Sequence, residues 1–405
     1  MRKRAAAVLG FAAVAVLAGA AWFGRRGTPV SRPLTFAGAG GVERLTLSPD
    51  GRTLAEGSRL GQVTVFDALT GAHRYALAVR ASRMIFSPDG RRLLTVARGG
   101  PPATNGTIQV WDAATGAALS RLVVPVGPPG TASSAQPRVA AFSSDLRRVA
   151  VRDPAHCTVY DLATGHQLRV IPAAPSGRGN VAFSRDGNVL AVGSDQGLGG
   201  LTLWDTRAWR PLAALGEQVG QISGVRFSPN GARLAFSTAA GLSWWDVPSR
   251  KRLGFFAAPK AAGHGLGQAR FASDSGSLVF TEMGSTDTVH IVDCTTTRER
   301  MTLPNQAAEN TPLSGESTSL SGDRAVTVLR PRPSQILFFH ETYAILDIGR
   351  QREICRIAVP SAPGTATLST LGGDWQVHIT ALSADGHVFA AGGCDDGIIH
   401  VWRIP

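Results

Sequence analysis

The residues of this sequence that are able to do chemistry are scattered along the chain. Its nine histidines show no pairing with the spacing of metal ligands, and its four cysteines, at positions 157, 294, 355 and 394, form no CxxC pair. The adjacent acids Asp395 and Asp396 fall in an expected turn, where Asp is common for structural reasons. No Walker A loop, HExxH or GxSxG motif is present, and the glycine-rich GHGLGQ (263–268) lacks the last glycine of a dinucleotide-binding fingerprint. The sequence therefore predicts isolated or buried thiols, no metal site, no cofactor and no enzymatic activity.

The basic charge of the chain is spread rather than grouped. The formal net charge is +12, and removing the five basic residues of the first 26 leaves +7 on the remainder. This net positive charge is compatible with an anionic partner, for example nucleic acid or a lipid surface. No basic stripe interleaved with aromatic residues is present, however, of the kind that single-strand binders use. We therefore expect no nucleic-acid partner and interpret the charge as an arginine-rich surface.

Residues 1–27 have the pattern of an export or anchor segment. Three basic residues precede nineteen uncharged residues, AAAVLGFAAVAVLAGAAWF (5–23), which are enough to span a bilayer as a helix. The basic residues before this segment outnumber the two after it, which predicts an inside N-terminus and an extracytoplasmic remainder. Ala18-Gly19-Ala20 resembles a cleavage site, so the alternative is a signal peptide and a secreted or periplasmic protein. The pair Arg25-Arg26 favours an uncleaved signal anchor, with the membrane contacted through this helix.

One hairpin pattern returns eight times after this segment. Each copy has a short apolar run that ends in Phe or Leu, followed by a turn of the type Ser-Pro-Asp-Gly. In this turn Pro fixes φ, Asp bonds its own backbone and Gly accepts a positive φ. The copies read LTLSPDG (45–51), MIFSPDG (84–90), AAFSSDL (140–146), VAFSRDG (181–187), VRFSPNG (225–231), ARFASDS (269–275), TSLSGDR (318–324) and TALSADG (380–386).

A second pattern follows each copy, and it consists of a β-rich strand ending in Asp, a tight turn and a further strand. It reads VTVFDALTG (63–71), IQVWDAATG (108–116), CTVYDLATG (157–165), LTLWDTRAW (201–209), LSWWDVPSR (242–250), VHIVDCTTT (289–297), YAILDIGRQ (343–351) and IIHVW (398–402). Each unit therefore has four strands, a to d, with tight a–b and c–d turns and looser b–c and d–a loops. Repeated four-stranded units of this size are typical of the blades of a β-propeller, which bury both faces of each sheet by packing radially.

The two ends of the chain predict how the ring closes. The last unit stops after its strand c, and SRPLTFAG (31–38) looks like WRPLAALG (209–216), a strand d. The N-terminal strand is therefore expected to complete the last blade and to cover an exposed sheet edge. The sequence predicts an all-β, monomeric propeller over 28–405 with eight four-stranded blades, or with seven if the weak unit 304–357 packs irregularly.

The pairing of FSPDG with VWD resembles the WD40 repeat, and the resemblance covers nearly all of the chain after residue 32. It implies a WD40-like propeller that serves as a scaffold for protein–protein interaction, with partners that the sequence does not identify. The chain departs from the family because no Gly-His dipeptide precedes the a strands and only Asp396 matches the Asp of the b–c turn. The family's Asp–His–Ser/Thr–Trp hydrogen-bond network is therefore not expected in most blades, and apolar packing is expected to supply the stability.

The long connections predict the partner surface. They are 97–106, 124–137, 303–316, 330–342 and 359–376. All five are b–c or d–a loops, which leave from one face of a propeller, here named the long-loop face, and binding groups tend to lie on such loops. Residues that open the a strands at this face are expected to line the central opening, and Trp375 is the candidate aromatic contact. The candidate partner-binding residues are Glu43, Arg44, Arg83, Arg138, Asn180, Gln268, Trp375 and His378.

Two enzyme classes with propeller folds are alternatives to the scaffold. The turns DALTG, DAATG and DLATG resemble those of quinoprotein dehydrogenases, whose repeats carry a Trp four residues after the Gly. This chain has Tyr75, Ser120 and Arg169 there, and it has no adjacent cysteine pair, which disfavours that class. A hydrolase or lactonase with a site in the central opening stays the alternative, because its catalytic residues would converge from separate blades without a linear motif.

Overall fold

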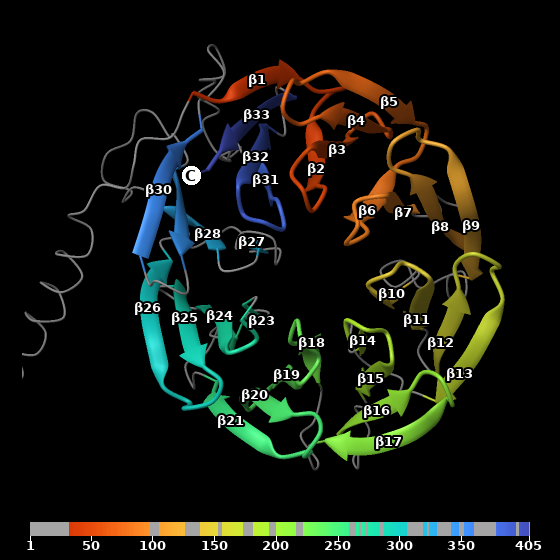
Figure 1. The fold of residues 1–405 in the computed structure, drawn as a ribbon, viewed down its shortest axis with the longest axis vertical. Helices are drawn as coiled ribbons and strands as arrows, with labels where there is room; N and C mark the ends of the chain where they lie inside the picture. The colour runs from red at the N-terminus through yellow and green to blue at the C-terminus, as the bar shows by residue number, and fades with distance from the viewer. Residues whose placement is uncertain are drawn as a thin grey trace, which may run out of the picture.

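The chain folds into a closed ring of β-sheets around a central opening (Figure 1). The computed structural model describes residues 32–97, 105–125, 138–152, 156–172, 181–193, 200–215, 222–258, 265–266, 269–272, 274–283, 287–305, 319–321, 324–329, 342–347, 352–359, 378–393 and 397–404. Within these ranges there are 33 strands and no helix. The strands form eight antiparallel sheets, seven of four strands and one of five, so the predicted eight-bladed propeller is confirmed.

We number the blades from 1 to 8, and in each blade the strands a to d run from the central opening to the outer rim (Figure 1). Blade 1 contains β2 (Val42–Leu47), β3 (Thr53–Ser58), β4 (Val63–Asp67) and β5 (His73–Leu77). Blade 2 contains β6 (Ala81–Phe86), β7 (Arg92–Ala97), β8 (Asn105–Asp112) and β9 (Ala118–Pro125). Blade 3 contains β10 (Arg138–Phe142), β11 (Arg148–Arg152), β12 (His156–Asp161) and β13 (Gln167–Pro172). Blade 4 contains β14 (Val181–Phe183), β15 (Val189–Gly193), β16 (Leu201–Asp205) and β17 (Arg210–Leu215).

The second half of the ring repeats this order. Blade 5 contains β18 (Ser223–Phe227), β19 (Arg233–Thr238), β20 (Gly241–Asp246) and β21 (Arg252–Ala257). Blade 6 contains β22 (Gly265–Leu266), β23 (Arg270–Phe271), β24 (Ser277–Met283), β25 (Asp287–Asp293) and β26 (Glu299–Asn305). Blade 7 contains β27 (Ser319–Ser321), β28 (Arg324–Leu329), β29 (Thr342–Asp347) and β30 (Arg352–Ala358). Blade 8 contains β31 (His378–Leu382), β32 (Val388–Gly393), β33 (Ile398–Arg403) and β1 (Leu34–Ala37).

Blades 6 and 7 are the irregular part of the ring. In blade 6 the inner strand is broken into β22 and β23, which both pair with β24, and this break is why the sheet counts five strands. The unit predicted to be weak, 304–357, still forms a four-stranded sheet as blade 7. The sequence pattern therefore identified the correct number of blades even where its turn residues are least regular.

The ring closes through β1, as the sequence predicted. This N-terminal strand pairs antiparallel with β33, so that Leu34 lies opposite Val401 and Ala37 opposite Ile398. Beyond the strand, the Gly38 amide donates to the Gly397 carbonyl at 2.7 Å. Because β1 supplies strand d of the last blade, the outer edge of that sheet is paired by the other end of the chain.

The a–b turns share a hydrogen-bond arrangement that we call the serine clamp. In blade 1 the buried Ser48 hydroxyl donates to Asp50 at 2.6 Å and accepts from the Thr53 amide at 2.9 Å. The Asp50 carboxylate accepts in turn from the Arg52 amide at 3.1 Å. The same pattern recurs with Ser87 and Asp89, Ser143 and Asp145, Ser184 and Asp186, Ser228 and Asn230, and Ser383 and Asp385. The clamp satisfies the polar groups of each turn locally, which fixes the register of strands a and b.

The c–d turns use Asp in a different way. The Asp112 carboxylate accepts from the amides of Ala114 and Thr115 at 3.0 and 2.9 Å, and these hydrogen bonds, led by the Thr115 amide, lower the pKa of Asp112. The residue four positions after this Asp has a positive φ and is Gly116 here, as it is Gly in blades 1 and 3. In blades 4 to 6 the same left-handed position is held by Trp209 (φ 52°), Arg250 (φ 60°) and Thr297 (φ 57°).

The hydrophobic core is a set of layers between neighbouring blades. The cluster between blades 4 and 5 joins Leu201, Leu203 and Leu215 to Val225 and Phe236, all at most 2% exposed. Equivalent clusters lie between blades 1 and 2, 2 and 3, 3 and 4, 5 and 6, 7 and 8, and 8 and 1. At these seven joints, the described residues bury the faces of the blades against neighbouring blades rather than within one sheet.

A buried carboxylate lies beneath the closing strand. Glu56 on β3 is fully buried, its Oε2 accepts from the Ala39 amide at 2.9 Å, and its Oε1 has no hydrogen-bond partner among the described residues. Burial raises the pKa of Glu56, and the Ala39 amide offsets only part of this effect. The glutamate therefore secures the segment between β1 and β2 while carrying a charge that its surroundings disfavour.

We expect the free energy of unfolding of Glu56→Gln, relative to that of the wild type, to increase as the pH rises. The folded chain holds the Glu56 proton more tightly than the unfolded chain, so wild-type stability is lost as the pH rises through the raised pKa. Glutamine keeps an acceptor for Ala39 without this loss. Urea denaturation at pH 4.5 and pH 8 measures the difference. Glu43→Gln, at an exposed ion pair, is the control and should change stability by less than about 0.5 kcal/mol at either pH. A difference for Glu56→Gln that does not change with pH would contradict the prediction.

Two glycine substitutions at positive φ should have opposite effects. Arg250 is exposed, so Arg250→Gly removes left-handed strain and should raise the free energy of unfolding by about 0.5–1 kcal/mol. Leu146 also has a positive φ, of 52°, but its side chain is only 3% exposed, so Leu146→Gly should lower that free energy by about 1–2 kcal/mol. Chemical denaturation of the two variants measures both effects. Destabilisation of both variants would contradict the strain at Arg250, and stabilisation of both would show that strain outweighs the burial of Leu146.

Candidate functional site in the central opening

Four of the five arginines on the inner strands around the central opening stand an even number of positions before the a–b turn residue of their blade. Arg44 on β2 and Arg83 on β6 stand four positions before the turn serines of their blades, Ser48 and Ser87. Arg226 on β18 and Arg270 on β23 stand two positions before the corresponding turn residues, Ser228 and Ala272. Side chains alternate along a strand with a period of two, so these four positions share one face of their strands.

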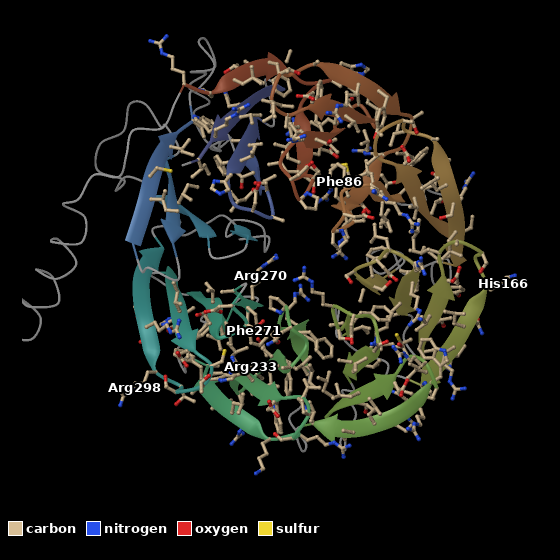
Figure 2. The ribbon with its side chains drawn as sticks, in the orientation of Figure 1. Phe86, His166, Arg233, Arg270, Phe271 and Arg298 are labelled. Carbon is tan, nitrogen blue, oxygen red and sulfur yellow. The ribbon has the colours of Figure 1, made fainter. Side chains whose placement is uncertain are left out.

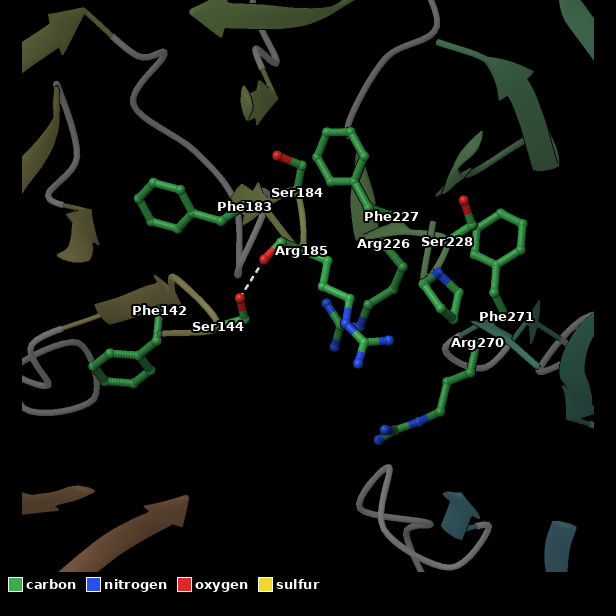
Figure 3. Close-up of a pocket in the computed structure, with 11 residues that line it drawn as sticks. Phe142, Ser144, Phe183, Ser184, Arg185, Arg226, Phe227, Ser228, Arg270 and Phe271 are labelled. Atoms are coloured by element: carbon green, nitrogen blue, oxygen red, sulfur yellow. Dashed lines mark hydrogen bonds between the residues drawn. The ribbon is translucent and has the colours of Figure 1, made fainter. Parts of the chain in front are cut away.

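A hollow of about 340 Å³ opens where the inner strands of blades 3 to 6 meet their a–b turns (Figure 3). We call it the basic hollow. The arginines Arg185, Arg226 and Arg270 line it together with a phenylalanine from each of the four blades. Its remaining lining comes from turn residues. The phenylalanines are Phe142, Phe183, Phe227 and Phe271, and the turn residues are Ser144, Ser184, Ser228 and Pro229. Figure 3 shows the arginine side chains extending into the open space. The site therefore combines cationic groups with aromatic surface.

Burial and neighbouring arginines both act on the charge of Arg226 in the basic hollow. Desolvation, followed by the charges of Arg270 and Arg83, lowers the pKa of Arg226 to about 10. Arg226 also donates to the Val225 carbonyl at 2.9 Å. The guanidinium carbon of Arg83 lies 5.7 Å from the centre of the Phe142 ring, a cation–π distance that links blades 2 and 3. A positive potential is thus concentrated at the centre of the ring.

The side chains of the basic hollow are suited to binding rather than to acid–base chemistry. Guanidinium groups bind carboxylates and phosphates through two parallel hydrogen bonds. The hydroxyls of Ser184 and Ser228 donate to Asp186 and Asn230 in their serine clamps, and Ser144 donates to the Arg185 carbonyl. No His, Asp or Glu is among the eleven described residues that line the hollow, so none of these serines has an adjacent base there. Elsewhere in the described part of the chain, no group of three or more His, Cys, Asp or Glu residues is placed to hold a metal ion.

Comparisons with known proteins agree with this architecture. The family described as WD domain, G-beta repeat matches residues 367–403. The crystal structure of the C-terminal WD40 domain of Sif2 is similar with a TM-score of 0.66 at 13% identity, over 93% of this chain and 99% of that one. The chain is a WD40-like β-propeller. The computationally designed Ika8 protein is also similar, with a TM-score of 0.59 at 18% identity, over 92% of this chain and 100% of that one. No curated protein matches the sequence.

The predicted contact residues of this WD40-like propeller are only partly described. Glu43 lies at the start of β2 and forms an exposed ion pair with Arg80 at 3.2 Å. Arg44 and Arg83 lie on inner strands, as predicted. Arg138 opens β10 and His378 opens β31, but their side chains are outside the described part. Asn180, Gln268 and Trp375 lie wholly outside the described residues, as do most residues of the five long connections. Their role in binding stays a prediction.

Arg226 and Arg270, the two inner-strand arginines of the basic hollow, were not among the predicted contact residues. The predicted residues open the a strands at the long-loop face, whereas these two stand two positions before the a–b turn residue of their blade. The sequence signal for these arginines is their position, two residues before the turn serine or the residue that replaces it. The repeat pattern does not mark this position as basic, because it is occupied by Thr46, Ile85 and Ala141 in blades 1 to 3.

Only part of the family's hydrogen-bond network is present in this propeller. In blade 2 the Trp111 Nε1 donates to the Thr95 hydroxyl at 2.9 Å, which preserves a Trp–Thr pair. In blade 4 the buried Trp204 Nε1 has no hydrogen-bond partner within the part of the chain that the structure describes. The Trp244 Nε1 instead donates to the Cys294 carbonyl of blade 6 at 3.1 Å. The predicted weakening of the network is therefore seen in these blades. The predicted burial of the thiols holds for Cys157, Cys294 and Cys355.

We expect Arg226→Met to raise the free energy of unfolding of the propeller by about 1 kcal/mol at pH 7 and low salt. The folded state depresses the pKa of this guanidinium, so its charged form is disfavoured at neutral pH, and this cost is relieved only above about pH 10. Urea denaturation at low and high salt measures the change, which should shrink as salt screens the repulsion. Arg298→Met, on the outer rim (Figure 2), is the control and should have little effect. A destabilised Arg226→Met variant would show that the contacts of Arg226 outweigh the repulsion.

Proposed function

We propose that this propeller is a scaffold for protein–protein interaction, tethered to a membrane or exported, that holds its partners on the long-loop face. The observation that carries the proposal is the attachment of the long connections. They join β7 to β8, β9 to β10, β26 to β27, β28 to β29 and β30 to β31. Each is a b–c or d–a connection, and in antiparallel blades these strand ends lie on one face. A rigid ring that carries its longest loops on one face suits partner binding.

The tether is proposed from the sequence. The described residues include no helix that is long and apolar enough to cross a membrane, and the segment 5–23 lies outside them. Since β1 begins at Leu34, a linker of about ten residues would separate this segment from the ring and reach at most ~35 Å. The ring would then lie close to the membrane surface, on the extracytoplasmic side.

A pull-down from the membrane fraction tests both parts of the proposal. The bait is the full chain with a C-terminal tag, and its intact mass is read in the same run. We expect a stoichiometric protein partner on uncleaved bait. Replacing 126–137 and 360–377 by short Gly-Ser linkers should abolish this partner, whereas Arg250→Gly, in a tight turn, should keep it. Thermal unfolding checks that both variants fold.

Two results would count against the scaffold. If the partner persists without the long loops, the long-loop face does not hold it. If no partner is found and the bait has lost its first ~20 residues, the protein is a secreted propeller, and screening for hydrolase activity in the central opening is the next experiment.

A further inference from the structure

Most of the large apolar side chains that the described chain exposes lie on the outer strands of two neighbouring blades. Seven such side chains are exposed among the described residues, and four of them belong to β9 and β13, in blades 2 and 3. We call these four the rim patch. They are Leu119 (53% exposed), Val123 (49%), Leu168 (38%) and Val170 (38%). Exposed apolar side chains that are grouped in this way mark an interaction surface, whereas single ones need no explanation.

The two strands of the rim patch follow each other along the outer rim (Figure 1). Gly165, in the turn that leads into β13, lies beside the Leu122 side chain of β9. His166, from the same turn, points outward from the rim (Figure 2). The rim patch therefore lies on the side wall of the ring. It is separate from the long-loop face, which the proposed function uses.

The outer edge of β9 is a free sheet edge in the described part of the chain. β9 is the last strand of its sheet and pairs with β8 alone among the described strands. Its eight residues make it the longest of the eight outer strands. The outer strands β17 and β26 contain Pro211 and Pro304, which lack a backbone donor, whereas the proline of β9 is its last residue, Pro125. β9 therefore offers a nearly uninterrupted row of backbone groups to a further strand.

The two faces of β9 differ at this edge. Leu122 and Val124 belong to the apolar cluster between blades 2 and 3 and are at most 6% exposed, so this face is turned towards blade 3. Arg121 and Val123 alternate with them and therefore lie on the opposite face. Leu119 precedes Arg121 by two positions and continues that face. A strand added at the edge would extend both faces beyond β9.

The rim patch residues of β13 face the space beyond this edge. Leu168 and Val170 stand on the opposite face of β13 from Ile171, which is 1% exposed and belongs to the cluster between blades 3 and 4. They are therefore turned towards blade 2. We propose that the free edge of β9 binds an extended segment of a protein partner as a fifth strand of blade 2, with apolar side chains against Leu168 and Val170 and an acidic side chain beside Arg121. Main-chain hydrogen bonds supply the affinity of such strand addition, and alternate side chains supply the specificity.

The charge of the edge selects an acidic segment. Arg121 stands near the middle of β9, is exposed, and forms no hydrogen bond or ion pair with another described residue. β9 and β13 contain one further exposed arginine, Arg169, and neither strand contains Asp or Glu. Opposite charges at facing positions of two strands stabilise the pair, and like charges destabilise it. A carboxylate on the added strand is therefore favoured beside Arg121, and a basic side chain is disfavoured there.

A second copy of this chain and a lipid surface fit the edge less well. Two β9 edges that pair about the middle of the strand would bring the two copies of Arg121 close together, and basic side chains on an edge protect against such self-pairing. A lipid surface would cover the rim patch but would leave the backbone groups of the edge without hydrogen-bond partners. An acidic strand satisfies the charge, the apolar surface and the backbone together.

The test is fluorescence anisotropy with the full chain and the labelled heptapeptide Val-Thr-Val-Glu-Val-Thr-Val. The control peptide has lysine in place of glutamate. We expect the wild type to bind the glutamate peptide about threefold or more tightly than the lysine peptide at low salt, and Arg121→Glu to reverse this preference. Arg298→Glu makes the same change of charge on the exposed outer rim of blade 6 (Figure 2) and should keep the wild-type preference.

Two further comparisons test the apolar and the backbone contacts. Leu168→Asn should weaken binding about fivefold or more, whereas Leu60→Asn, at an exposed leucine outside the rim patch, should leave it within about twofold. N-methylation removes backbone donors of the peptide, either at its third and fifth residues or at its second, fourth and sixth. Since alternate amides of a strand point to opposite edges, we expect one methylated peptide to lose binding and the other to keep it.

Several outcomes would overturn the inference. These are absence of binding to the wild type, equal affinity of the two methylated peptides, or the same preference in Arg121→Glu and Arg298→Glu. A dimer in sedimentation that excludes the peptide would indicate a second copy at the edge. Binding to phosphatidylglycerol vesicles but not to the peptide, lost in Leu168→Asn, would indicate a lipid surface. Thermal unfolding in parallel shows whether each variant is folded. The scaffold on the long-loop face makes no use of this edge, so either proposal can fail without the other.

Discussion

No sheet of this protein can bury its own two faces, and the rest of the structure follows from that constraint. Each described apolar cluster spans two blades, so a blade without its neighbours would expose a core surface on either side. A linear stack would leave two such surfaces and a closed ring leaves none. The pairing of β1 with β33 is therefore the central contact of the fold, because it joins the ends of the chain in one sheet.

The hairpins that build the blades are stabilised locally, which explains how the chain tolerates an incomplete WD40 network. The serine clamp closes the a–b turns of blades 1 to 5 and 8 within about six residues, and the aspartates of the c–d turns of blades 1 to 6 accept from amides of their own turns. Neither arrangement needs a contact with another blade. The hydrogen-bond partners of the tryptophans can therefore differ between blades, as they do for Trp111 and Trp244. Apolar layers supply the cohesion between blades, and Arg148 and Arg233 add hydrogen bonds across two of the joints.

The features that the sequence predicted well are those that repeat. The hairpin period gave eight blades, and the likeness of 31–38 to a strand d gave the closure, because both depend on local turn chemistry and on strand alternation. The basic hollow was not predictable in this way. Phe142, Phe183, Phe227 and Phe271 are regular repeat positions, whereas Arg226 and Arg270 are exceptions within their repeats. The repeat pattern describes what the blades share, and the site depends on where two adjacent blades differ from the others.

The location of those exceptions follows from the packing of the ring. Along an inner strand, positions such as Val225 and Phe271 face the layers between blades and must be apolar, since both are at most 9% exposed. The alternate positions border the central opening, where a charged group keeps some contact with water and costs less than in the layers. Substitution there leaves the turn clamps and the apolar layers intact. A propeller can therefore gain charge at its centre without losing its fold. The inner strands are therefore suited to residues that determine binding specificity. In this chain, Arg226 of blade 5 and Arg270 of blade 6 lie at such positions.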